Sequence, residues 1–77
     1  MESRDILAAN LKRLRKAKGL SQEELAHQVG IDRTYVSALE RKVYAASIDL
    51  VDRLAKALGE EPQALLSPLP TDPGAKD

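Results

Sequence analysis

The stretch that decides the fold is QEELAHQVGIDRTYVSALER, residues 22–41. Its pattern predicts two short helices joined by a tight turn. Ala26 is small where the helices would cross, and Gly30 can adopt the positive φ that the turn needs. The apolar residues that would hold the second helix across the first are Ile31, Val36 and Leu39. This spacing is typical of a helix-turn-helix, whose second helix presents its opposite face to solvent.

Capping signals mark where these two helices begin. Ser21 stands three residues before Glu24, which is the spacing of a capping box. Asp32 is a candidate N-cap for the second helix, which we expect to end near Lys42. A loop is expected over residues 43–46.

Three more helices are predicted outside the motif. Leucines recur at helical spacing before Gly19, a C-terminal stop signal. Ser47 is expected to cap a fourth helix that ends at Gly59, and Pro62 to open a short fifth helix. The expected inward residues of the fourth helix are Ile48, Val51, Leu54, Ala55 and Leu58. Since no strand alternation appears, we predict an all-α domain over residues 1–66, followed by a disordered Pro-rich tail over residues 67–77.

Composition excludes several classes of function. The 77 residues contain no cysteine and one histidine, His27, which leaves no basis for a disulfide, a zinc thiolate site or a Ser-His-Asp triad. We therefore expect no enzyme, no metal and no cofactor. No apolar run approaches the roughly 20 residues of a membrane span and no signal peptide is visible, so a cytoplasmic protein is expected.

The net charge of zero is unevenly distributed along the chain. Residues 1–18 carry six basic and two acidic side chains, whereas residues 47–77 carry six acidic and three basic ones. The protein therefore has either a basic and an acidic face or an ordinary scatter of surface charge. Charge alone does not choose between these two readings.

Residues 4–66 resemble the lambda repressor-like helix-turn-helix proteins of the XRE family. The matching segments are LKRLRKAKGLSQEELA (11–26), GIDRTYVSALER (30–41) and SIDLVDRLAKALG (47–59). The small size and the DRTYVSxLER helix are similar to controller proteins of restriction–modification systems. The resemblance implies a compact five-helix fold and a sequence-specific, nucleoid-associated transcriptional regulator, with recognition helix 33–42 in the major groove of double-stranded DNA.

The resemblance also implies roles for individual residues. The family's base contacts fall at positions that correspond here to Arg33, Thr34, Ser37 and Ala38, which are expected on the exposed face of the recognition helix. The expected contacts to the DNA backbone are Gln22, Tyr35, Arg41, Lys42 and Tyr44. Partial packing against the protein is an equally open alternative for Tyr35.

Two structural expectations come from the same comparison with the family pattern. The family pairs an arginine at the end of the first helix with the glutamate of the LER ending, which implies a partly buried ion pair between Arg15 and Glu40. The family usually has glycine where Lys42 stands, and a lysine held there in the left-handed conformation costs about 1 kcal/mol. The usual Asn-Pro before the fourth helix is replaced by Ala45 and Ala46.

An apolar surplus in the last two helices predicts a homodimer. One recognition helix covers only a few base pairs, which is too little for high selectivity by itself. With Ile48 expected inward, Leu50 would point away from the core. We therefore expect a two-fold dimer interface formed by Leu50, Leu65 and Leu66, with the recognition helices about 34 Å apart on a palindromic operator.

Two other functions remain open for this sequence. One is the antitoxin of a toxin–antitoxin pair, which shares the fold and also binds a toxin. The other, of a different class, is a helical protein–protein adaptor that has lost DNA binding. An adaptor would show an apolar stripe where this chain has Arg33, Thr34, Arg41 and Lys42, so DNA binding is favoured.

Overall fold

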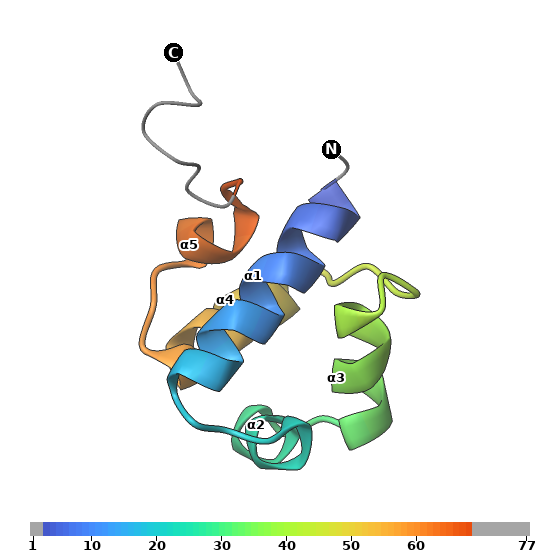
Figure 1. The fold of residues 1–77 in the computed structure, drawn as a ribbon, viewed down its shortest axis with the longest axis vertical. Helices are drawn as coiled ribbons and strands as arrows, with labels where there is room; N and C mark the ends of the chain where they lie inside the picture. The colour runs from blue at the N-terminus through green and yellow to red at the C-terminus, as the bar shows by residue number, and fades with distance from the viewer. Residues whose placement is uncertain (1–2, 69–77) are drawn as a thin grey trace.

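The computed structural model describes residues 3–68, which contain five helices joined by turns and loops (Figure 1). They are α1 (Ser3–Ala17), α2 (Gln22–Val29), α3 (Arg33–Glu40), α4 (Ile48–Leu58) and α5 (Pro62–Leu66). α1 runs through the middle with α4 behind it, α5 and α3 lie on opposite sides, and α2 closes the lower end. The described part of the chain contains no strand, and the predicted all-α, five-helix class is confirmed. None of its helices has the length and apolar character needed to cross a membrane.

Hydrogen bonds between near neighbours set the starts of α2 and α4. The Glu24 N–H donates to Ser21 Oγ at 3.0 Å and the Ser21 N–H donates to Glu24 Oε1 at 2.7 Å, which completes the predicted capping box. The Leu50 N–H donates to Ser47 Oγ at 3.1 Å. Asp32 precedes α3 in an extended conformation, but its side chain makes no capping hydrogen bond. The bonds at α2 and α4 satisfy N–H groups that have no partner within the helix.

Left-handed residues follow four of the five helices, and after α1 this residue is Gly19, with a φ of 72°. Gly30 ends α2 with a φ of 85°, and Gly59 ends α4 with a φ of 69°. Lys42, just after α3, has a φ of 67°, so a lysine does occupy the left-handed position where the family usually has glycine. The contact of its β-carbon with the following carbonyl makes this conformation unfavourable by about 1–2 kcal/mol.

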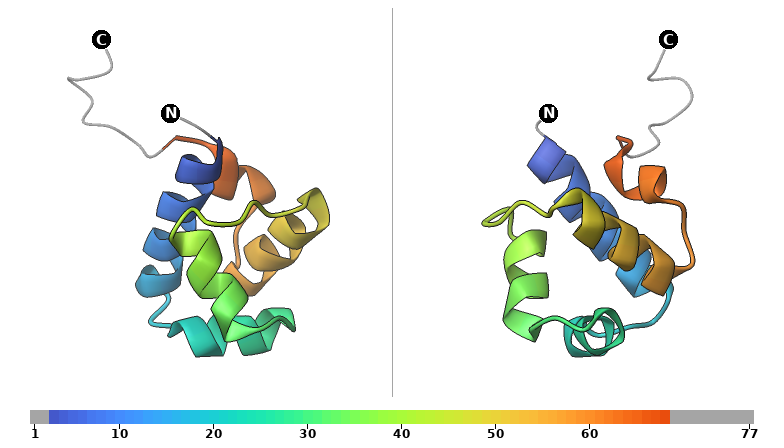
Figure 2. Two further views of the ribbon diagram at one scale, coloured as in Figure 1. Left: turned by 90° about the vertical axis from the view of Figure 1, so that its right-hand side faces the viewer. Right: turned by 180° about the vertical axis from the view of Figure 1, so that it is seen from behind.

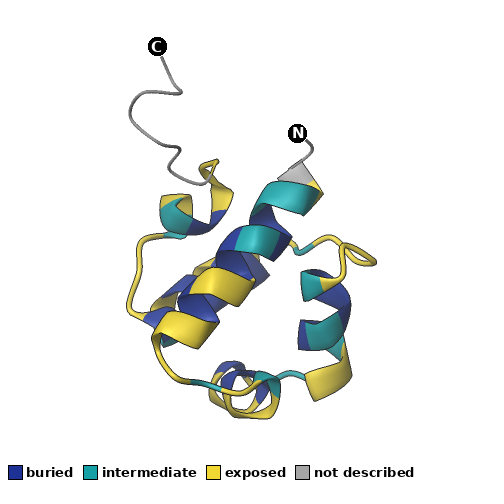
Figure 3. Cartoon of the chain, in the orientation of Figure 1, coloured by how far each residue is buried: buried dark blue, intermediate teal, exposed yellow. Residues whose placement is uncertain are grey.

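The core lies where the helices meet (Figure 3). The exposed fractions of residues in α4 and α5 contradict part of the predicted dimer interface. Ile48 is 83% exposed although it was expected inward, whereas Leu50 is only 5% exposed. The two residues lie roughly 200° apart around α4, at opposite edges of its apolar stripe. Other parts of the chain cover the edge that carries Leu50 and leave the edge that carries Ile48 exposed. Leu65 is fully buried as well. The prediction that Leu50 and Leu65 form a dimer interface is therefore wrong, whereas Leu66 is 49% exposed.

A buried asparagine ties the end of α5 to α1. Asn10 is fully buried, and its Nδ2 donates to the Leu65 carbonyl at 3.0 Å and to the Ser67 carbonyl at 2.6 Å. Ser67 thus belongs to the folded unit, although the sequence placed it in the tail. Residues 69–77 of that predicted tail lie outside the described residues.

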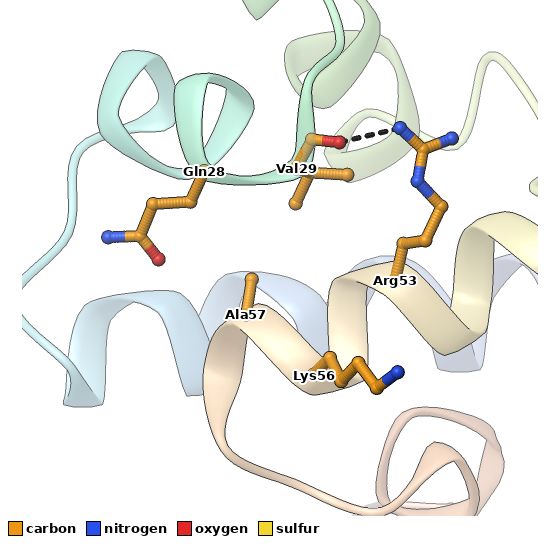
Figure 4. Close-up of a pocket in the computed structure, with 5 residues that line it drawn as sticks. All are labelled: Gln28, Val29, Arg53, Lys56 and Ala57. Carbon is orange, nitrogen blue, oxygen red and sulfur yellow. Dashed lines mark hydrogen bonds between the residues drawn. The ribbon is translucent and has the colours of Figure 1, made fainter.

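An arginine connects α4 to the last turn of α2. Arg53 Nη2 donates to the Val29 carbonyl at 2.6 Å, across a hollow that Gln28, Lys56 and Ala57 also line (Figure 4). The carbonyls of a last helical turn have no partner within the helix, so this bond satisfies one of them. It joins the C-terminal end of α2 to α4.

Candidate nucleic-acid interface

α2 and α3 form the predicted helix-turn-helix, and α3 lies at the surface. In the left view of Figure 2, α3 faces the viewer, α2 crosses below it, and residues 41–47 pass above it. The turn is closed by Ala26, whose carbonyl accepts the Gly30 N–H at 2.8 Å and the Ile31 N–H at 3.0 Å. Ala26 is 2% exposed, as its place at the helix crossing requires. Among residues 3–68, no helix packs over the outer side of α3.

The outer side of α3 carries a polar set of side chains. Arg33 and Thr34 are exposed, and Ser37 is half-buried on the same side. Arg41 follows one turn later, and its Nε donates to Ser37 Oγ at 3.3 Å. Guanidinium and hydroxyl groups donate to or accept from base edges, so this surface has the chemistry needed for base recognition. We call these four residues the outer face of α3.

Ala38 does not belong to the outer face. It is 4% exposed, because the α3–α4 connection lies against its side of the helix. The Val43 N–H donates to the Ala38 carbonyl at 2.9 Å, and the Val43 and Tyr44 side chains line the same hollow as Ala38. The prediction that Ala38 is exposed for base contact is therefore wrong. Val43, which is 52% exposed, was not among the residues predicted for this surface, although an apolar residue in a predicted loop was a signal for it.

The two tyrosines form an aromatic pair beside α3. Their ring centroids lie 5.7 Å apart and the ring planes meet at 88°, which is a favourable edge-to-face geometry. Tyr35 is half-buried and packs against the core, so the structure supports the packing alternative for this residue. Tyr44 is 55% exposed and leaves much of its ring free. Tyr35 thereby holds Tyr44 against the recognition helix.

The predicted ion pair joins α1 to the end of α3. Arg15 Nε lies 2.6 Å from Glu40 Oε2, and Arg15 Nη2 donates to Glu40 Oε1 at 3.0 Å. Arg15 Nη1 donates to the Leu20 carbonyl at 2.8 Å. The side chains of the pair are only 9% and 4% exposed, and the hydrogen bond to Glu40 raises the pKa of Arg15 above its ordinary value. Arg15 therefore stays charged, and its bonds to Glu40 fix the orientation of α3.

Gln22, the predicted phosphate ligand, takes part in the same network. It is half-buried, and its Nε2 donates to Glu40 Oε1 at 3.0 Å. An amide nitrogen carries two hydrogens, so one donor remains besides the N–H groups at the start of α2. A hollow at this end of α2 is lined by Arg15, Ser21, Gln22, Glu23 and Arg33. The helix N-terminus and the Arg33 guanidinium favour an anion there, whereas the Glu23 carboxylate opposes it and Arg15 is already paired with Glu40.

Lys42 lies on the other side of α3 and reaches toward α1. Its Nζ is 3.9 Å from Asp5 Oδ1, and the two side chains are 57% and 32% exposed. An exposed pair at this distance contributes about 0–1 kcal/mol. Such weak pairing leaves the ammonium group available to another anion. Lys42 therefore offers a cation on one flank of the outer face, and Gln22 offers an amide donor on the opposite flank.

Known proteins share both the sequence pattern and the helix arrangement. Residues 11–65 match the family model described as Helix-turn-helix, HTH_3. A hypothetical transcription factor from Neisseria meningitidis serogroup B is 49% identical over 65 residues, which cover 84% of this chain and 61% of that protein. The chain thus spans less than two thirds of that relative's length.

Solved structures with the same fold include a controller protein and a DNA complex. The restriction-modification controller protein C.AhdI from Aeromonas hydrophila has a TM-score of 0.78 and 44% identity, over 80% of this chain and 94% of that chain. The master regulator for biofilm formation SinR, in complex with DNA, has a TM-score of 0.76 and 31% identity, over 79% of this chain and 98% of that chain. Both likenesses extend through the helix-turn-helix.

Proposed function

The chain belongs to the helix-turn-helix family of XRE-type, lambda repressor-like transcription regulators, and we propose that it binds a palindromic operator as a homodimer, with α3 in the major groove. The observation that carries this proposal is the outer face of α3. Arg33, Thr34, Ser37 and Arg41 stand together there, beside an ion pair that fixes the helix. The similarity to C.AhdI favours the controller of a restriction–modification system as the setting in which the protein acts.

The residues of the interface divide into base and phosphate contacts. Arg33 suits the O6 and N7 acceptors of guanine, the Thr34 methyl suits a thymine methyl, and Ser37 suits either kind of base edge. The phosphate contacts are assigned to Arg41, at the end of the outer face, and to three side chains beside it, Gln22, Lys42 and Tyr44. The first group would select sequence, and the second would position the protein on any duplex.

The dimer contact is assigned to exposed apolar residues of the last two helices. Ile48 at the start of α4 is 83% exposed and Leu66 at the end of α5 is 49% exposed. A second copy would remove both from water, and two-fold symmetry would place two recognition helices on successive major grooves, about 34 Å apart. Each α3 would then contact one half-site of a palindrome.

Selection from random-sequence DNA, followed by gel-shift titration, tests the proposal. We expect a palindromic consensus, and Arg33→Ala should weaken binding to it by about 1–3 kcal/mol and relax one base position per half-site. Lys42→Ala should weaken binding to all sequences alike. Lys56→Ala, which removes an exposed lysine of α4 beside the hollow of Figure 4, is the charge-matched control and should change neither. No enriched sequence, or full selectivity in Arg33→Ala, would contradict the assignment.

A further inference from the structure

Lys42 and Asp5 bring a cation and an anion together on one flank of the outer face of α3. Lys42 follows α3, Asp5 lies in the first turn of α1, and Lys42 Nζ is 3.9 Å from Asp5 Oδ1. We propose that Asp5 limits the affinity of this protein for DNA, because a phosphate must compete with its carboxylate for the Lys42 ammonium group. The inference rests on the proposed function, which takes Lys42 as a phosphate contact.

Backbone hydrogen bonds hold the lysine at this place. The Lys42 N–H donates to the Leu39 carbonyl at 3.2 Å, and the Val43 N–H donates to the Ala38 carbonyl at 2.9 Å. Lys42 keeps a φ of 67°, although this conformation is unfavourable for a residue with a β-carbon. The family usually has glycine at this position, so the ammonium group is an addition of this chain to the family pattern.

The geometry of the pair makes Asp5 a competitor and not a support for Lys42. A distance of 3.9 Å is longer than a hydrogen bond, so the carboxylate does not orient the ammonium group. The two side chains are 57% and 32% exposed, for Lys42 and Asp5 respectively. What Asp5 contributes is its charge, which cancels part of the positive potential that a phosphate would meet. Removing the carboxylate therefore strengthens the binding of an anion by Lys42.

Asp5 also has a structural role in α1. A carboxylate in the first turn of a helix is stabilised by the partial positive charge of the helix N-terminus. That role by itself would change the stability of the domain and leave its affinity for DNA unchanged. Measurements of affinity and of stability therefore separate the two roles.

Competition for Lys42 also changes the salt dependence of binding. Each phosphate that a protein neutralises releases counterions, which steepens the slope of log K against log salt by about 0.9 on B-DNA. Asp5 lowers the net charge that Lys42 brings to a phosphate, so the wild-type contact contributes less than this amount. Without the carboxylate, the slope should become steeper by up to about 0.9 for each bound copy of the protein.

Gel-shift titrations of Asp5→Asn at several salt concentrations test the inference. The probes are the duplex selected from random DNA and a scrambled version of it. We expect Asp5→Asn to bind both about threefold more tightly for each bound copy, the effect of one exposed ion pair, and with the steeper salt slope. Asp52→Asn, which removes an exposed carboxylate of α4, is the charge-matched control and should change neither quantity.

A Lys42→Met variant shows whether Asp5 acts through Lys42. Methionine keeps a long unbranched side chain and removes the charge. Lys42→Met should bind both duplexes more weakly, and adding Asp5→Asn should then change the affinity by less than about 1.5-fold for each copy. Because both side chains are partly exposed, all variants should fold, which melting curves by circular dichroism check.

The outcomes separate this inference from the proposed function. If a duplex is selected but Asp5→Asn binds it like the wild type, or if Asp5→Asn has its full effect without Lys42, the inference is overturned and the proposed function stands. A gain confined to the selected duplex also refutes the inference, since phosphate contacts are independent of sequence. If DNA is bound without selection and the threefold gain remains, the inference stands and sequence-specific binding does not. If no duplex is bound at all, both are overturned.

Discussion

Replacing Glu40 with alanine removes one buried acceptor that serves three hydrogen bonds. Two come from Arg15, at 2.6 and 3.0 Å, and one comes from Gln22, at 3.0 Å. Arginine does not lose its proton in proteins, so the guanidinium left behind keeps its charge. Its side chain is only 9% exposed, and the bond to the Leu20 carbonyl alone would remain from its present partners. The variant therefore holds a nearly buried, unpaired cation.

The expected loss of stability is large for a domain of this size. Removal of one partner from a buried ion pair costs about 3–5 kcal/mol. A chain of 77 residues has a free energy of unfolding of about 4–12 kcal/mol. At about 4 °C or more per kcal/mol, the melting temperature of Glu40→Ala should fall by at least about 12 °C.

Thermal and urea unfolding, followed by far-ultraviolet circular dichroism, measure this loss. Glu23→Ala, which removes an exposed carboxylate of α2, is the control and should change stability by less than about 0.5 kcal/mol. Replacing both partners, Arg15→Met with Glu40→Leu, should recover much of the loss, because no unpaired charge remains. If Glu40→Ala unfolds at the same temperature as the control, the assignment of Arg15 and Glu40 as the link between α1 and α3 is refuted.

Three further changes test other parts of the molecule. Lys42→Gly should stabilise the domain, because relief of the left-handed strain, about 1–2 kcal/mol, exceeds the entropic cost of glycine, about 0.5–1 kcal/mol; a urea midpoint no higher than that of Lys42→Ala would contradict this. The Ser21 N–H and hydroxyl hold the pKa of Glu24 below its ordinary value of 4.5, so the capping box contributes stability above that pH and loses it as pH falls through the lowered pKa. Melting temperatures of wild type and Glu24→Gln should therefore differ near neutral pH and converge in acid, and a constant difference would exclude the capping carboxylate as its source. Ile48→Glu should yield a folded monomer in sedimentation, whereas Leu50→Glu should unfold; a dimeric Ile48→Glu would remove Ile48 from the interface.

The sequence by itself determined the helices and the helix-turn-helix. Ser21 and Glu24 cap each other across three residues, Ser47 caps α4 at the same distance, and Gly30 and Gly59 end their helices in the left-handed conformation. Each of these interactions is made between residues a few positions apart. Their energies do not depend on the rest of the fold, so the pattern of residue types was enough to predict them.

The ion pair between Arg15 and Glu40 was predicted from the family pattern and not from local signals in the sequence. Twenty-five positions separate its members, so neither spacing nor propensity could have paired them, and the family pattern supplied the expectation. The third member, Gln22, was expected to point outward, and only the tertiary structure turned its amide toward Glu40. The buried Asn10, whose partners lie 55 and 57 positions away, gave no sequence signal at all.

Only the tertiary structure decided which residues at the edges of the helices are covered. Ile48 and Leu50 lie at opposite edges of one apolar stripe, and Ala38 lies at the edge of the outer face of α3. Successive residues turn by about 100°, so helical periodicity gives the direction of a stripe but leaves its edges open by about one residue. The element that closes an edge comes from elsewhere in the chain, as the α3–α4 connection does when it covers Ala38. Burial at such positions is therefore a property of the assembled fold.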